Sequence, residues 1–114
     1  MGVAFEAQVA GIRMLSEPIK TEDEAKILSY HLNENHIFSC SWGPFDDGKK
    51  MEMPDLLNFK AMVYGILHGR FELGTIYIFA AGNGGQKDNC NYDGYANSAS
   101  GNCRDLTIII INQK

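Results

Sequence analysis

A glycine-rich turn holds the residue of this 114-residue chain that is best suited to catalysis. Asn83 stands among three glycines in FAAGNGG, residues 79–85, directly after an apolar run. On a tight turn its amide could donate a hydrogen bond to an oxygen that becomes negative during a reaction. Asn and Gly also form ordinary turns, and taken alone they are more simply explained that way. A phosphate-binding loop is disfavoured, because neither GxGxxG nor GxxxxGK[ST] occurs.

Two polar loops carry the carboxylates that could bind a cation. They are SWGPFDDGKK, residues 41–50, and GGQKDNCNYDGY, residues 84–95. Their acids are Asp46, Asp47, Asp88 and Asp93. Each loop by itself is also typical of a solvated turn. If the loops converge, their like charges need a cation between them, either calcium or a basic substrate side chain.

The elements that must position these loops follow an alternating pattern. Apolar runs predict strands at Ala7–Leu15, His36–Trp42, Gly74–Ala81 and Leu106–Ile111, and apolar spacing predicts helices at Thr21–Leu32 and Pro54–Gly69. Thr21 and Glu24 have the spacing of a capping box at the start of the first helix. The order predicts an α/β fold, a three-layer αβα arrangement around a parallel sheet with right-handed crossovers. Ligands bind at the carboxyl ends of strands in such sheets, and both polar loops follow strands.

Composition limits the possible partners. The chain is 45% hydrophobic and 21% charged, which suits one globular domain or a piece of one. A net charge of −4 argues against nucleic acid and anionic membranes, and favours basic ligands such as basic peptides. No membrane segment or signal peptide is predicted, because no apolar run approaches the roughly 20 residues of a membrane helix. Cys40, Cys90 and Cys103 cannot all pair within one chain.

Three signatures in register resemble one protein family. SCSWGPFDDGK, AAGNGG and DNCNYDGYANS, in this order and spacing, resemble the kexin and furin branch of the subtilases. The resemblance covers Gly2 to about Ser98. It implies a subtilisin-like fold, with residues 1–98 as a partial peptidase S8 catalytic domain. Residues 99–114 do not follow the family pattern and form a divergent tail.

The resemblance assigns roles to the residues of the polar loops. Asn83 matches the oxyanion-hole residue, and Asp46 and Asp93 match the acids of the S1 pocket, which receives arginine or lysine before the cut. The matches to the wall of this pocket are Ser41, Trp42, Gly43 and Pro44. Asp46 and Asp88 match ligands of a calcium ion (Ca²⁺) beneath it.

Two further acids match the outer subsites, which favour additional basic residues. They are Glu24 and Glu52. The simpler alternative for Glu24 is a helix-capping carboxylate, a role that is compatible with the subsite role. Cys90 matches a disulfide cysteine whose family partner lies downstream of this chain's end.

The activity implied by the resemblance is that of a calcium-dependent serine endopeptidase. Such enzymes process proproteins after dibasic Lys/Arg-Arg sites, in the secretory pathway (Golgi) or at the cell surface. The family's triad aspartate and histidine precede the segment that begins at Gly2, and its serine lies beyond Lys114. We therefore expect the chain alone to be inactive. The alternative is a truncated, non-catalytic chain that at most binds basic peptides.

Overall fold

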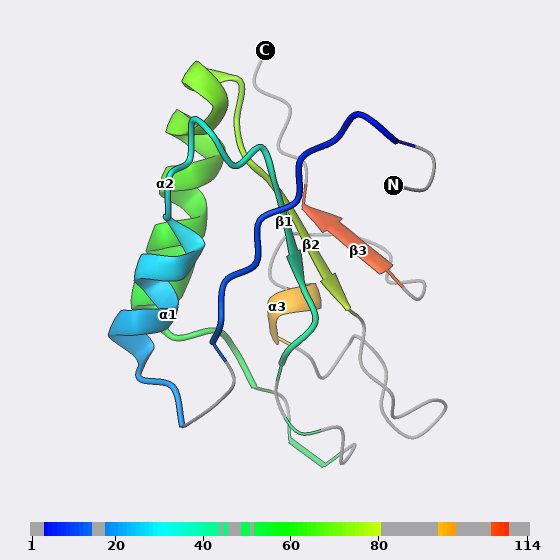
Figure 1. Cartoon of the computed structure of the whole chain (residues 1–114). Helices are drawn as coiled ribbons and strands as arrows, with labels where there is room; N and C mark the ends of the chain where they lie inside the picture. The colour runs from blue at the N-terminus through cyan, green and yellow to red at the C-terminus, as the bar shows by residue number, and fades with distance from the viewer. Residues whose placement is uncertain are drawn as a thin grey trace.

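The computed structural model describes residues 4–14, 18–43, 45, 49–50, 52–80, 94–97 and 106–109. Their elements are α1 (Thr21–Leu28), β1 (Ile37–Cys40), α2 (Leu56–Glu72), β2 (Ile76–Ala80), α3 (Gly94–Asn97) and β3 (Leu106–Ile109). The strands form one sheet in the order β1-β2-β3, and α1 and α2 pack together on one of its faces (Figure 1). The layers therefore agree with an α/β domain.

The pairing of the strands confirms the predicted parallel crossover and corrects one detail. β1 and β2 are parallel, with Ile37 opposite Ile76 and Cys40 opposite Phe79, and α2 is the crossover helix between them. β3 instead runs antiparallel to β2. The described part of the connection between β2 and β3 holds only the four-residue α3. A parallel strand needs a longer crossover, usually a full helix, whereas an antiparallel strand does not.

Both long helices lie where apolar spacing placed them, but their ends differ from the prediction. α1 ends at Leu28, and the chain continues in turns. The predicted capping box is wrong, because Thr21 is already helical and the side chain of Lys20, at the N-cap position, makes no capping hydrogen bond. α2 does have a side-chain cap, since Asp55 accepts from the backbone N–H of Leu57. Its regular backbone breaks at Gly69, where φ and ψ are −70° and 161°.

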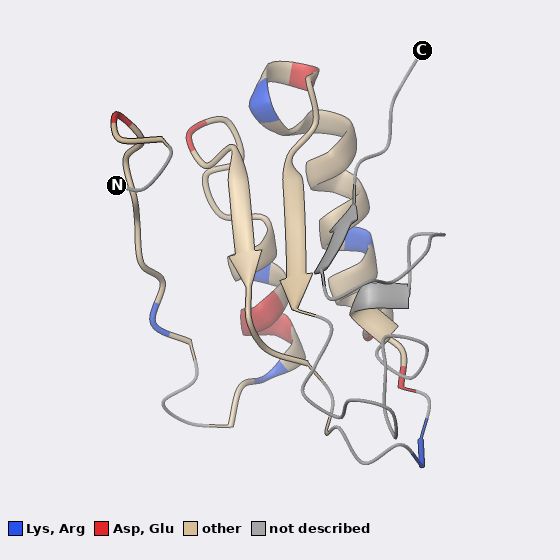
Figure 2. Cartoon of the chain, turned by 90° about the vertical axis from the view of Figure 1, so that its right-hand side faces the viewer, with Lys and Arg blue, Asp and Glu red and all other residues tan. Residues whose placement is uncertain are grey.

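The predicted strand at Ala7–Leu15 is wrong for the described residues 7–14. These residues lie outside the outer edge of β1 without strand pairing (Figure 2). Val9 and Ile12 are exposed, so the apolar run has no face to pack on. Strand propensity is realised only through ladder pairing and side-chain burial, and the described structure gives this segment neither.

The core lies between the sheet and the two long helices. Tyr77 and Phe79 of β2 are fully buried, and Phe38 of β1 stacks on Tyr77. Ile76 and Ile78 point to the other face and are only partly buried. Figure 2 shows this second face with no described helix in front of it. The second helical layer that a three-layer arrangement places on this face is therefore not seen in the described part of the chain.

Gly65 of α2 permits the close approach of helix and sheet. A Cβ at this position would lie 2.1 Å from the hydroxyl oxygen of Tyr77 and 3.2 Å from Leu32. The Tyr77 ring cannot move away easily, because it is fully buried and its hydroxyl donates to the carbonyl of Leu28. Only glycine fits between the helix and this ring.

We expect Gly65→Ala to destabilise the chain. Overpacking of this kind costs about 1–3 kcal/mol, which more than offsets the roughly 1 kcal/mol by which alanine favours a helix. Urea unfolding followed by circular dichroism measures the change. Tyr77→Phe removes the atom in conflict, so Gly65→Ala should cost less in that background. An equal cost in both backgrounds would show that the Tyr77 hydroxyl is not the obstacle.

Candidate functional site

The carboxyl ends of β1 and β2 meet at one edge of the sheet. The parallel register places Cys40 beside Phe79, so the loops that begin at Ser41 and after Ala80 leave the same edge (Figure 1). This was the predicted position for ligand-binding loops. Pro44, Asp46, Asp88, Asp93 and Asn83 lie outside the described residues. Their roles stay predictions.

Trp42 is fixed at this edge by a ring contact and a hydrogen bond. Its indole lies edge-on to Phe79, with ring centroids 5.9 Å apart, and its Nε1 donates to Glu24 Oε1 at 2.8 Å. Tyr95 of α3 stacks on Phe79 at 4.9 Å. Ser41 and Gly43, on either side of Trp42, are exposed. Among the three predicted wall residues that the structure describes, Trp42 is thus the one anchored to the core.

Glu24 is the centre of a buried polar network. Its side chain projects from α1, and the residue is only 8% exposed. Oε1 accepts hydrogen bonds from Trp42 Nε1 and from the hydroxyl of Tyr95 at 2.5 Å, and Oε2 accepts from Asn58 Nδ2 at 2.6 Å. These three donors are neutral and come from three other parts of the chain. The helix-capping alternative for Glu24 is therefore wrong, while its role in an outer subsite stays a prediction.

Glu52 lies near the same network through its backbone. Its side chain is exposed, and its carbonyl oxygen would be 1.9 Å from a Cβ placed on Gly94, the first residue of α3. Glycine at this position lets α3 pack directly against the loop before α2. The structure thus brings the segment around Glu52 next to Tyr95, which binds Glu24.

Asn58 and Tyr95 belong to this network, although sequence reasoning did not select them. Asn58 is 1% exposed, and its Nδ2 donates to both Glu24 Oε2 and the Tyr95 hydroxyl. A signal for Asn58 was present in the sequence. It begins the buried stripe of α2, four residues before Met62 and eight before Ile66. A polar residue on an apolar helical stripe needs a buried partner.

Comparison with known proteins places the chain in a family. Residues 1–112 match the sequence model of the Subtilase family. The chain belongs to this family. It is 56% identical to kexin of Saccharomyces cerevisiae, 52% to the dibasic-processing endoprotease of Schizosaccharomyces pombe and 50% to proprotein convertase subtilisin/kexin type 7 of Homo sapiens.

Each of these three matches extends over 99 residues, or 86% of this subtilase chain. The chain spans 12–14% of the length of these relatives. The resemblance to the kexin branch is thereby confirmed, and with it the expected α/β, subtilisin-like fold. The parallel β1–β2 pair and its crossover helix agree with this fold.

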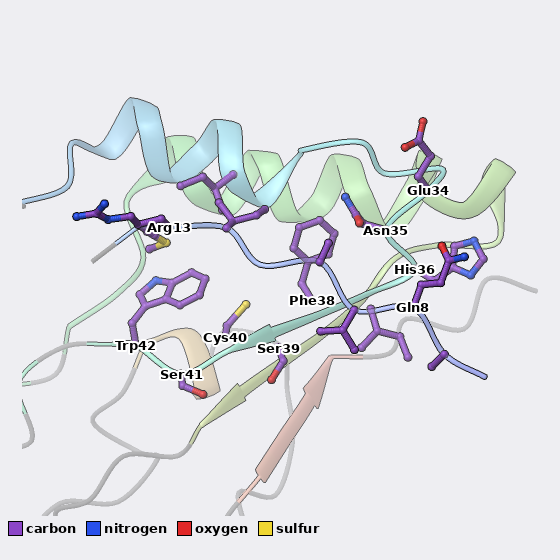
Figure 3. Close-up of a pocket in the computed structure, with 17 residues that line it drawn as sticks. Gln8, Arg13, Glu34, Asn35, His36, Phe38, Ser39, Cys40, Ser41 and Trp42 are labelled. Carbon is purple, nitrogen blue, oxygen red and sulfur yellow. The ribbon is translucent and has the colours of Figure 1, made fainter. Parts of the chain in front are cut away.

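A cavity of about 980 Å³ runs along the outer edge of β1 in this subtilase chain. It separates β1 from the N-terminal segment, with Trp42 and Arg13 near one end and Gln8 and His36 near the other (Figure 3). Among the described residues no backbone hydrogen bond joins the segment to β1. To form the predicted strand, residues 7–14 would have to move into this space and pair with β1.

Cys40 borders this cavity, and its environment disfavours the thiolate. Burial and, second, the charge of Glu24 raise the pKa of the Cys40 thiol to about 12 from its ordinary value of 9.0. Between these two values the unfolded chain loses the proton that the folded chain keeps. The unfolded state then binds fewer protons, so stability must fall as the pH rises from about 9 towards 12.

We therefore expect alkaline pH to destabilise the wild-type chain more steeply than a Cys40→Ala variant. The difference in slope can reach about 1.4 kcal/mol per pH unit, the effect of one proton. Urea unfolding at pH 8, 9 and 10 measures it. Parallel pH dependence in the two proteins would contradict the assigned pKa.

Metal and membrane features were also sought in the described part of the chain. It contains no group of three or more His, Cys, Asp or Glu residues that could hold a metal ion. The expected calcium ligands Asp46 and Asp88 lie outside it. No described helix is both long and apolar enough to span a bilayer.

Proposed function

We propose that this chain is part of the catalytic domain of a calcium-dependent, kexin-like serine endopeptidase that processes proproteins after dibasic Lys/Arg-Arg sites. The observation that carries the proposal is the 50–56% identity to kexins, a convertase and a dibasic-processing endoprotease. The geometry supports it, because both loops that hold the proposed site residues leave one sheet edge.

In this proposal the turn after β2 supplies the oxyanion donor, and the two loops together supply the acids of the pocket. Asn83, after β2, donates to the oxygen that becomes negative when the peptide carbonyl is attacked. Asp46 and Asp93 receive the arginine or lysine before the cleaved bond. Trp42 lines the entrance, and its hydrogen bond to Glu24 and its ring contact with Phe79 keep the indole in place.

Calcium fits the donor chemistry of the two loops. Asp46 and Asp88 offer carboxylate oxygens, the ligands that this hard cation prefers. A calcium ion there would offset the repulsion between acids that must converge to bind a basic side chain. We propose that the parent enzyme acts in the secretory pathway (Golgi) or at the cell surface, as the family resemblance implies.

The second candidate function is binding of basic peptides without cleavage. It is favoured by the net charge of −4 and by the absence of any residue in these 114 that matches the family's triad. A nucleophile, a base and an orienting group are all needed for acyl transfer, and an oxyanion donor alone cannot replace them. We propose that the chain by itself binds such peptides but does not cleave them.

A titration of the chain with calcium and a blocked Lys-Arg peptide tests the proposal. Trp42 is the only tryptophan, so its fluorescence reports on the pocket wall directly. Saturable quenching by the Lys-Arg peptide, weaker with a Leu-Leu peptide and weaker without calcium, is expected. A fluorogenic Lys-Arg substrate should remain uncleaved. Equal quenching by both peptides, with and without calcium, would contradict the proposed pocket.

A further inference from the structure

The carboxylate of Glu24 has little capacity left for a further partner. A carboxylate offers about four lone-pair sites, and in this chain Trp42, Tyr95 and Asn58 occupy three of them. Arginine binds a carboxylate best through two parallel N–H groups, one to each oxygen. Both oxygens of Glu24 are already engaged, and the residue is 8% exposed. Trp42 and Tyr95 fill both sites of Oε1, which excludes this mode, while Oε2 keeps one free site beside Asn58. Two N–H groups of an arginine side chain can both bind Oε2 only if Asn58 leaves it.

Asn58 is the donor that occupies Oε2, the second carboxylate oxygen of Glu24. Trp42 and Tyr95 both donate to Oε1, so without Asn58 the atom Oε2 would have no donor among the described residues of this network. The Asn58 bond, at 2.6 Å, is also shorter than the 2.8 Å bond from Trp42. Removing this one amide would therefore free an entire carboxylate oxygen.

The orientation of the Asn58 amide is fixed by its two acceptors. Its Nδ2 serves both Glu24 and Tyr95, and a rotated amide would place its own oxygen against the carboxylate. Its Oδ1 is buried with no hydrogen-bond partner among the described residues. A buried acceptor without a partner is costly. An apolar side chain would avoid that cost at this position, so the amide is explained by its hold on Glu24.

We propose that Asn58 is a specificity-determining positioning residue, which locks the Glu24 carboxylate and so weakens the preference of the outer subsite for a basic peptide residue. The inference rests on the proposed function and on the outer-subsite role that the family resemblance implies for Glu24. In this chain Glu24 acts through Trp42 and Tyr95, whose positions it holds, more than by direct contact with the peptide. Removal of Asn58 frees Oε2 for an incoming guanidinium group.

Carboxyl labelling tests, without any peptide, whether Asn58 keeps the Glu24 carboxylate inaccessible. Carbodiimide-activated coupling of glycine ethyl ester, read by mass spectrometry, reports how accessible each carboxylate is. Glu22 is exposed on the same helix and serves as the internal control. Glu24 should label far more slowly than Glu22 in the wild-type chain and faster in Asn58→Ala. Labelling of Glu24 at the rate of Glu22 in the wild-type chain would overturn the lock.

Peptide preference tests the effect on specificity. The ratio of Kd values is measured for acetyl-Ala-Val-Lys-Arg-amide and acetyl-Arg-Val-Lys-Arg-amide, using Trp42 fluorescence. Asn58→Ala should shift this ratio about tenfold towards the arginine peptide, the effect of one hydrogen bond to a charged group. The shift should vanish in Glu24→Gln. If Asn58 had only a structural role, Asn58→Ala would weaken the binding of both peptides by the same factor.

Controls keep the outcomes distinct. Asn58→Leu fills the same space but has no hydrogen-bond donor. If circular dichroism shows that Asn58→Ala does not fold, the same shift in the Kd ratio is expected for Asn58→Leu. An unchanged ratio in a variant that binds Lys-Arg peptides overturns the specificity role. If the wild-type chain binds neither peptide, the proposed function fails for this chain and the specificity role with it, while labelling still decides the lock.

Discussion

Replacing Asn83 by alanine is expected to lower kcat about 10²- to 10³-fold in a kexin that carries this chain. This is the loss known for an oxyanion-hole donor in a subtilisin, a member of the same family. The enzyme is a chimera, the Saccharomyces cerevisiae kexin in which the matching 99 residues are exchanged for those of this chain. The relative then supplies the remaining catalytic groups, and KM should change little because the bond forms with the developing oxyanion.

Hydrolysis of a fluorogenic Lys-Arg substrate by the chimera and by its Asn83→Ala variant measures this loss in kcat. Glu22→Ala, at an exposed position of α1, serves as a control that leaves the proposed oxyanion donor intact. If Asn83→Ala raised KM while kcat stayed unchanged, Asn83 would be a residue of substrate binding and the assigned role would be wrong.

Replacing Glu24 by alanine is expected to destabilise the chain itself by about 3 kcal/mol or more. Hydrogen bonds to a charged group contribute about 1.5–3 kcal/mol each, and three donors would lose this acceptor together. Asn58 is buried and could not turn to water for compensation. Such a loss is a large part of the 5–15 kcal/mol that typically stabilises a small domain.

Urea unfolding followed by far-ultraviolet circular dichroism measures the effect of Glu24→Ala independently of the Trp42 signal. Glu24→Gln keeps the shape and one acceptor oxygen, so it should cost less. Glu22→Ala, on the exposed side of α1, should cost almost nothing. Equal stability of the Glu24→Ala and Glu22→Ala chains would show that the network contributes nothing to folding.

The sequence predicted the elements that carry local signals. The spacing of Met62, Ile66 and their neighbours defined α2, and the apolar runs around Phe38 and Tyr77 defined the parallel strands. Their parallel arrangement followed from the helix between them. The shared edge of the two loops could be predicted for the same reason.

Features set by distant contacts could not be predicted from local patterns. The Thr21 and Glu24 spacing indicated a capping box, but the carboxylate finds three partners in the folded chain and none of them is the helix start. Tyr95 lies 71 residues from Glu24 in sequence, so no local rule connects the two. The apolar run at residues 7–14 has strand composition, yet pairing depends on a neighbour and a covered face.

For Glu24, the structure adds the hydrogen-bond partners that the family resemblance could not supply. The resemblance assigned this acid to peptide binding, and the structure shows it bonded to Trp42, Tyr95 and Asn58. Resemblance transfers a residue's role without the neighbours that decide whether its oxygens are free. Asn58 is such a neighbour.

We propose that the acids of the two loops form a pocket for the basic residue before the cut. The most direct measurement is the effect of Asp93→Asn on kcat/KM in the chimeric kexin, for a Lys-Arg substrate and for one with an uncharged residue before the cut. Loss of a buried charge partner costs about 2–5 kcal/mol, so the Lys-Arg substrate should lose at least about 30-fold more than the uncharged one. Equal losses for the two substrates would contradict the account.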